Sequence, residues 1–116
     1  MNLNEIIDQL GLTALTGTAN FAAVEPAGGY TSDLLSCVMA GAKKKGIWIT
    51  LQAHVNIVAV AALLELAAVI ISEGSQPDAD TIVKAKEEGV ILLGTELKSF
   101  EICGRLWELG LRPSVD

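Results

Sequence analysis

The sequence is poor in charged side chains. Only 22 of its 116 residues carry a formal charge, 8 basic and 14 acidic, whereas 51% of the residues are apolar. That much apolar sequence excludes an intrinsically disordered chain. A folded chain of this length exposes roughly 6,000 Å² of surface, which so few charges cover thinly. We therefore expect another protein chain to cover part of the apolar surface.

Basic residues are fewer than acidic residues, and the net charge is −6. This balance excludes a nucleic-acid partner, because neutralising phosphates requires a surplus of Lys and Arg on one face. The one basic run, 43–45, follows a predicted helix. We expect its cations to lie near the negative end of that helix, and contact with an anionic partner is the alternative.

Cysteine and histidine are also scarce. Cys37 and Cys103 lie within helical apolar patterns and lack the short spacing of a metal or redox motif. We predict two reduced core thiols in a cytoplasmic, reducing compartment; a disulfide or a metal site shared across a dimer is the alternative. His54 is the single histidine, and Glu96, a candidate base, has no assignable nucleophile or orienting partner. The sequence therefore predicts no catalytic residue, no metal and no cofactor.

Hydrophobic runs long enough to cross a membrane are missing. The most apolar stretch, 57–71, has Glu65 as its only charge. As a helix it reaches about 22 Å, short of the ~30 Å hydrocarbon core of a bilayer. Residues 1–5 lack the basic and apolar regions of a signal peptide. We expect no contact with a membrane.

Helical and extended patterns alternate along the chain. Apolar residues at helical spacing predict helices over 3–10, 34–42, 57–66 and 78–88, and a last helix marked by Phe100, Cys103, Leu106 and Trp107. Short β-branched runs predict strands over 13–15, 47–51, 68–71 and 90–93, with a strand or turn at Tyr30 after a loop over 18–29. The sequence therefore predicts one α/β domain over 1–116, with a mainly parallel sheet of four to five strands flanked by helices.

Polar residues follow the predicted parallel strands. In an open parallel sheet, ligands bind outside the carboxyl ends of the strands, so these residues are candidates for ligand binding. They are Thr50, Gln52, His54, Asn56, Ser72, Glu73, Gly74, Thr95 and Glu96. Each group also precedes a helix, so capping is the alternative, above all for Asn56 and Ser99. His54 suits either a proton-transfer or hydrogen-bonding role at a site, or packing and capping.

A second candidate site lies in the segment 28–32, where Gly29 and Ser32 belong to a Gly-Gly-Tyr-Thr-Ser run. Its backbone N–H groups suit an anion at the start of the following helix. The run lacks the lysine of a phosphate loop and the GxGxxG spacing, so a purely structural turn is the alternative.

Two helices lack a charged outer face. The predicted helix 34–42 has no charge, and the helix 57–66 has only Glu65. A helix that is apolar all round needs cover on both sides, and the simplest cover in so small a domain is a second copy of the chain. We predict a homodimer through these two helices.

The order of motifs resembles small stand-alone DRTGG-domain proteins over essentially the whole chain. The resemblance is carried by the runs 28–36 (GGYTSDLLS), 48–61 (WITLQAHVNIVAVA) and 100–104 (FEICG). The family's Asp-Arg pair falls on Ala53-His54, and its Thr-Gly-Gly falls on Ser72-Glu73-Gly74. The resemblance implies one DRTGG-like domain with a fold like the N-terminal domain of HPr kinase.

Related domains occur in phosphotransacetylases and regulated pyrophosphatases, and stand-alone members accompany iron-only hydrogenase subunits. The resemblance therefore implies a regulatory or dimer-forming role, with a redox complex as a partner. It does not extend to an iron–sulfur cluster, because two cysteines cannot supply four thiolate ligands. The missing arginine and the charge of Glu73 weaken any anion site in the crevice. A neutral or cationic ligand, or a nucleotide held through its base, fits better.

The leading hypothesis is a non-catalytic regulatory or assembly module that is homodimeric and associated with a hydrogenase or another redox complex. The alternative is a nucleotide-sensing domain that binds through residues 72–75 and the start of the helix at Ile57. An enzyme of unknown reaction is the third hypothesis.

Overall fold

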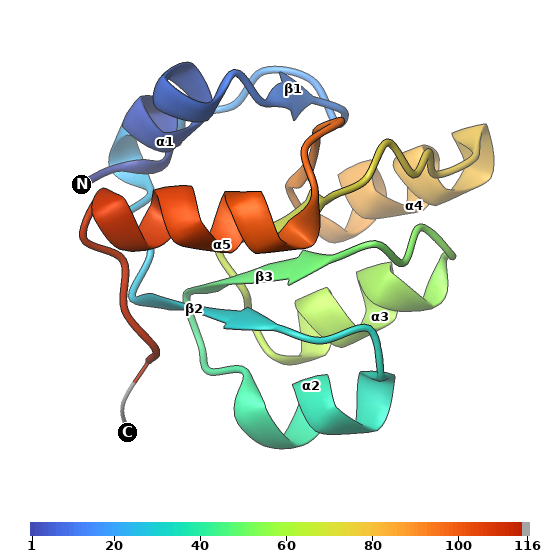
Figure 1. The fold of residues 1–116 in the computed structure, drawn as a ribbon. Helices are drawn as coiled ribbons and strands as arrows, with labels where there is room; N and C mark the ends of the chain where they lie inside the picture. The colour runs from blue at the N-terminus through green and yellow to red at the C-terminus, as the bar shows by residue number, and fades with distance from the viewer. Residues whose placement is uncertain (115–116) are drawn as a thin grey trace.

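The computed structural model describes residues 1–114, which contain a five-stranded sheet (Figure 1). The strands are β1 (Thr13–Ala14), β2 (Gly28–Thr31), β3 (Gly46–Thr50), β4 (Ala68–Ile71) and β5 (Leu92–Gly94), in the order β1-β5-β4-β3-β2. Neighbours among β2 to β5 pair in parallel, and β1 pairs antiparallel with β5. The predicted α/β fold with a mainly parallel sheet is therefore confirmed.

Helices cover both faces of the sheet. Helices α1 (Leu3–Leu10) and α5 (Ser99–Glu108) lie on one face, and α2 (Leu35–Gly41), α3 (Asn56–Leu63) and α4 (Ala79–Glu88) lie on the other (Figure 1). Alternate side chains of β3 enter the two cores, with Ile47 and Ile49 on the α1 and α5 side and Trp48 on the other. Every residue of β3 and β4 is consequently buried, as is typical of parallel strands between two helical layers.

Helix α1 spans the predicted residues 3–10, and α4 begins one residue later than predicted and ends as predicted. The Asn2 side chain accepts a hydrogen bond from the Glu5 N–H at the start of α1, and Gly11 ends that helix in the left-handed conformation. In α4 the Asp78 side chain accepts from the Thr81 N–H, and Gly89 ends the helix in the same way. These capping contacts are local, because each joins residues within about one turn of the helix end.

Helix α3 is shorter than predicted. It ends at Leu63 instead of residue 66, and Glu65 adopts the left-handed region with φ 54°. This turn reverses the chain so that it enters β4 at Ala68. The lysine run also lies beyond the last turn of α2, which ends at Gly41, and there Lys44 pairs with Glu65 at 3.4 Å.

The segment 28–31 forms the edge strand β2, preceded by a short 3-10 helix η1 (Phe21–Ala23) in the long connection. The tail after α5 runs beside it, with a parallel bridge between Gly29 and Pro113. Beside β2, therefore, this tail lies where a further strand would pair.

No helix within residues 1–114 is long and apolar enough to cross a lipid bilayer.

Candidate ligand-binding crevice

The carboxyl ends of β2 and β3 are joined through Asp33. Its Oδ1 accepts hydrogen bonds from the Thr50 hydroxyl at 2.7 Å and from the Leu51 N–H at 2.9 Å. The Thr50 hydroxyl oxygen also accepts a hydrogen bond from the backbone N–H of Gln52 at 3.1 Å. The side-chain amide of Gln52 donates to the backbone carbonyl of Asp33 at 3.2 Å. Thr50 is fully buried. Two of the predicted site residues thus hold the loops together, and Asp33, which is not one of the predicted site residues, is the centre of this network.

A second polar cluster lies at the ends of β4 and β5. The Ser72 hydroxyl is buried and lies 2.6 Å from the Ser99 hydroxyl. Glu73 Oε2 accepts from the Ser99 N–H at 3.2 Å, and Glu73 Oε1 lies 3.8 Å from Lys98 Nζ. The Glu73 carboxylate therefore lies at the N-terminus of α5, the position that an anionic ligand would take in a phosphate-binding site.

The adjacent loops fit closely around this cluster. The Gly74 N–H donates to the Thr95 carbonyl at 2.9 Å, and the Glu73 N–H donates to the Leu97 carbonyl at 2.8 Å. Gly74 has φ +73°, and a Cβ there would collide with the Glu96 carboxylate. The structure thus brings Ser72, Glu73, Gly74, Thr95 and Glu96 together, as a site at this edge requires.

His54 lies at the start of α3, where its Nδ1 accepts a hydrogen bond from the Asn56 N–H at 3.2 Å. This places His54 in a capping role for a helix whose N-cap residue, Val55, makes no side-chain capping bond. Asn56 and Ser99 are the first residues of α3 and α5, so the prediction that they are caps is wrong.

Asp78, the N-cap of α4, is hydrogen-bonded to Thr81. The pKa of Asp78 lies below its ordinary value because its carboxylate accepts hydrogen bonds from the Thr81 backbone N–H and side chain. The start of α4 therefore favours the ionised carboxylate.

The segment 28–32 does not have the geometry of the predicted anion site. Gly29 lies within β2, two residues from the end of the strand, and its N–H donates to the Arg112 carbonyl at 3.0 Å. Ser32 lies in the turn before α2, where its hydroxyl accepts from the Leu34 N–H at 3.1 Å and its carbonyl accepts from the Trp48 indole at 2.8 Å. No local pattern in the sequence indicates that the Gly29 N–H donates its hydrogen bond to the tail.

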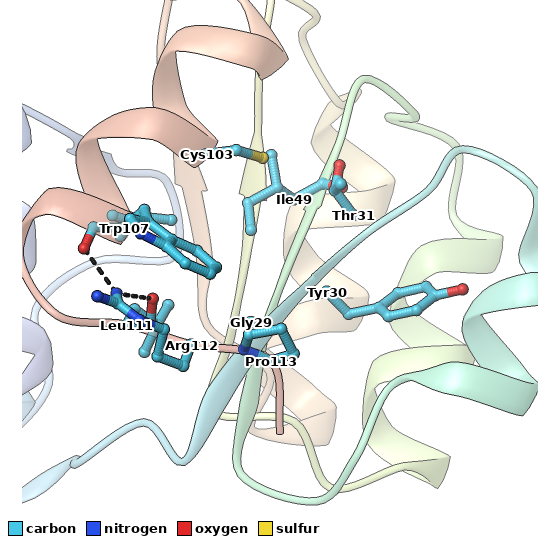
Figure 2. Close-up of a pocket in the computed structure, with 10 residues that line it drawn as sticks. Gly29, Tyr30, Thr31, Ile49, Cys103, Trp107, Leu111, Arg112 and Pro113 are labelled. Carbon is cyan, nitrogen blue, oxygen red and sulfur yellow. Dashed lines mark hydrogen bonds between the residues drawn. The ribbon is translucent and has the colours of Figure 1, made fainter. Parts of the chain in front are cut away.

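An apolar cavity of about 150 Å³ lies away from this crevice, between α5, β2 and the tail. Figure 2 shows its floor at Gly29 and Ile49, with Trp107 on one side and Cys103 and Thr31 at one end. The sequence placed Cys103 in the core and assigned Trp107 only to the last helix, so this cavity was not predicted. The signal for it in the sequence is the aromatic residue Trp107 on that helix, which lines the cavity.

The cysteine prediction is wrong in one respect. Cys37 and Cys103 are free, but Cys37 is exposed on α2 and Cys103 is half-buried, so neither is a core thiol. Within residues 1–114, no group of three or more His, Cys, Asp or Glu side chains is placed to hold a metal ion.

No protein-family model matches the chain, and no curated protein matches it significantly in sequence. Among solved structures, the chain is similar to the CBS and DRTGG domains of the regulatory region of the Clostridium perfringens pyrophosphatase, complexed with the activator diadenosine tetraphosphate. The TM-score is 0.72 at 22% identity, over 95% of this chain and 47% of that chain. The chain thus spans about half the length of that protein region, and it has a DRTGG-like fold, as the sequence resemblance implied.

Proposed function

We propose that the protein is a non-catalytic regulatory or assembly module that acts as a homodimer joined through α2 and α3. The observation that carries this proposal is the exposed apolar surface of these helices. Leu34, at the start of α2, is 61% exposed, and Leu63, at the end of α3, is 67% exposed. Met39 on α2 is also exposed. Charged side chains are absent from the whole segment 34–42.

Burial of these side chains supplies the driving force. Removing one Leu side chain from water contributes about 1.5–3 kcal/mol. A two-fold interface buries each residue twice, once from each copy. A regulatory role is supported by the similarity in fold to the pyrophosphatase regulatory region.

Size-exclusion chromatography with light scattering tests the homodimer at micromolar concentration. Leu34→Glu and Leu63→Glu each place a charge on the proposed interface, so we expect the dissociation constant to rise at least about tenfold. Val83→Glu is the matched control, because Val83 is equally an exposed apolar residue, but on α4. A wild-type monomer, or equal effects of all three variants, contradicts the proposal.

The resemblance to hydrogenase-associated proteins extends the proposal to a partner. We infer that the dimer binds a subunit of a redox complex. Titration of the purified protein against iron-only hydrogenase subunits checks this, and we expect saturable binding that the Val83→Glu variant retains. Absence of binding at tens of micromolar restricts the function to regulation by a ligand.

A nucleotide sensor is the second candidate. It is favoured by the diadenosine tetraphosphate bound to the pyrophosphatase region, although that region also holds CBS domains. The ligand would contact residues 72–75 and the start of α3. A nucleotide at 100 times its dissociation constant stabilises the folded state by about 2.7 kcal/mol. Thermal unfolding with adenine nucleotides therefore checks this candidate, and an unchanged midpoint at millimolar concentration excludes it.

A further inference from the structure

Helix α5 presents aromatic side chains to solvent. Phe100 is 91% exposed and Trp107 is 54% exposed. They are seven residues apart, which is about two turns, so both lie on the same side of the helix, about 10 Å apart along its axis. Between them on that side lie Cys103, which is half-buried, and Gly104, which is exposed. We call these four residues the α5 stripe.

The apolar cavity opens beside this stripe. Cys103, Leu106 and Trp107 line it from α5, and Leu111 and Pro113 line it from the tail (Figure 2). The cavity exists because β2 carries Gly29 and Thr31 on this side of the sheet and therefore fills little space there. A volume of about 150 Å³ with an apolar lining is of the size that holds a benzene ring.

A phenyl-sized cavity and an exposed phenyl ring thus lie two turns apart on one helix. We propose that the α5 stripe is a second self-association surface, on which α5 of a second copy packs antiparallel. With the two-fold axis near Cys103 and Gly104, Phe100 of the second copy lies beside Trp107, whose ring already has the Arg112 guanidinium 4.0 Å from its centre, and fills the cavity mouth. The reciprocal contact forms at the other end, as two-fold symmetry requires.

Two further features favour a second copy as the occupant. A Cβ at Gly104 would meet nothing within 4 Å in the chain itself, so the glycine leaves room for another helix to approach closely. The antiparallel arrangement also places Lys98, just before α5, at the end of the partner helix that carries Glu108. Lys98 lies 3.8 Å from Glu73 in its own chain and is 75% exposed, so its ammonium group is also accessible to a partner. The charges are opposite at both ends of the contact, which stabilises this orientation.

This surface is separate from the proposed α2 and α3 interface. Helix α5 lies on one face of the sheet, and α2 and α3 lie on the other (Figure 1). Both contacts are therefore available to one chain at the same time. A chain that makes both contacts joins two neighbouring copies, one through each two-fold interface.

The two cysteines allow each surface to be tested separately, since Cys37 lies on α2 and Cys103 lies on α5. We use two full-length variants, Cys37→Ser and Cys103→Ser, and treat each with a short bis-maleimide at tens of micromolar protein. Cys37→Ser retains only Cys103, so a covalent dimer of this variant reports the α5 contact. Cys103→Ser retains only Cys37 and reports the α2 and α3 contact.

We expect Cys37→Ser to form a covalent dimer, and we expect Phe100→Glu in the same background to reduce its yield at least tenfold. Phe100 is almost fully exposed, so its replacement leaves the fold intact. Leu63→Glu in that background is the control and retains the cross-link. Absence of the cross-link in Cys37→Ser, or its persistence in Phe100→Glu, overturns the α5 proposal, whatever Cys103→Ser shows about the other interface.

Gly104→Ala separates weaker association from a folding defect. Alanine stabilises a helix more than glycine does, so we expect the melting temperature of the monomer to rise. The added methyl group separates the two helices, so we expect the dissociation constant of the α5 contact to rise. A variant that loses folded stability in dilute solution, or that associates as tightly as the wild type, contradicts the role given to Gly104.

Discussion

Glu73 Oε2 accepts a hydrogen bond from the backbone N–H of Ser99 at 3.2 Å, so this carboxylate caps the helix α5 from a neighbouring loop. Glu73 reaches this position with φ 63°, a conformation that costs a non-glycine residue about 1 kcal/mol. In this crevice the chain therefore places its own negative charge where a ligand's phosphate would bind.

Replacing Glu73 by glycine removes this internal anion. The loss of a helix cap costs about 1 kcal/mol and the relief of the left-handed backbone offsets about as much, so we expect the free energy of unfolding in urea to change little. We expect millimolar phosphate to raise the melting temperature of Glu73→Gly and to leave the wild type unchanged. Glu96→Gln is the control for a general change in crevice charge. Equal responses of all three proteins would show that Glu73 does not block an anion site.

The Thr50 hydroxyl links β3 to the turn before α2 by donating to Asp33. Thr50→Val keeps the shape of the side chain but leaves the carboxylate and the Gln52 N–H without this partner. We expect the free energy of unfolding to fall by about 1–3 kcal/mol. A double-mutant cycle with Asp33→Ala measures the coupling directly, and strictly additive losses exclude an energetic link between the two side chains. Thr13→Val is the matched control, because Thr13 is exposed.

Gly28 allows the tail to pack closely against β2. A Cβ on Gly28 would lie 2.6 Å from the Ser114 nitrogen and 2.7 Å from the Arg112 carbonyl oxygen, and these backbone atoms must then shift. We expect Gly28→Ala to lower the free energy of unfolding by about 1–3 kcal/mol and to displace the tail.

Trp107 reports this displacement, because Arg112 lies 4.0 Å from the centre of its ring and donates to its carbonyl at 2.8 Å. The intrinsic fluorescence of Gly28→Ala is therefore expected to change in the folded state. Gly104→Ala, measured in dilute solution, supplies the comparison for a glycine whose Cβ has space. An unchanged spectrum in Gly28→Ala means that the tail stays in place.

Asp78 makes the stability of α4 depend on pH. Its pKa is lower in the folded chain than the ordinary value of 3.8, chiefly through the hydrogen bond from the Thr81 N–H. This contribution is fully present above pH 3.8 and is lost as the pH falls through the folded pKa. We expect wild type to exceed Asp78→Ala in stability at pH 7, and the difference to shrink below pH 4. Urea unfolding at several pH values measures it, and a constant difference contradicts the assignment.

The candidate residues at the strand ends show which part of the site the sequence predicts. Because parallel strands end at one edge, the sequence placed Ser72, Glu73, Thr95 and Glu96 together correctly. It did not assign their contacts, since the pairing of Glu73 with Ser99 joins residues far apart in the chain. A role for these residues in binding a ligand stays a prediction, as does a cytoplasmic location.

The sequence by itself determined the element types and their alternation, because capping residues, glycines and apolar periodicity act within a few residues of each other. Asn2, Gly11 and Asp78 are examples. Only the tertiary structure decided what Gly28 and Gly29 do: the tail approaches them from more than eighty residues away, and no local pattern encodes that contact. Only the tertiary structure likewise decided that Phe100 and Trp107, which have core-like spacing, are exposed, and that Trp107 borders the cavity between α5, β2 and the tail.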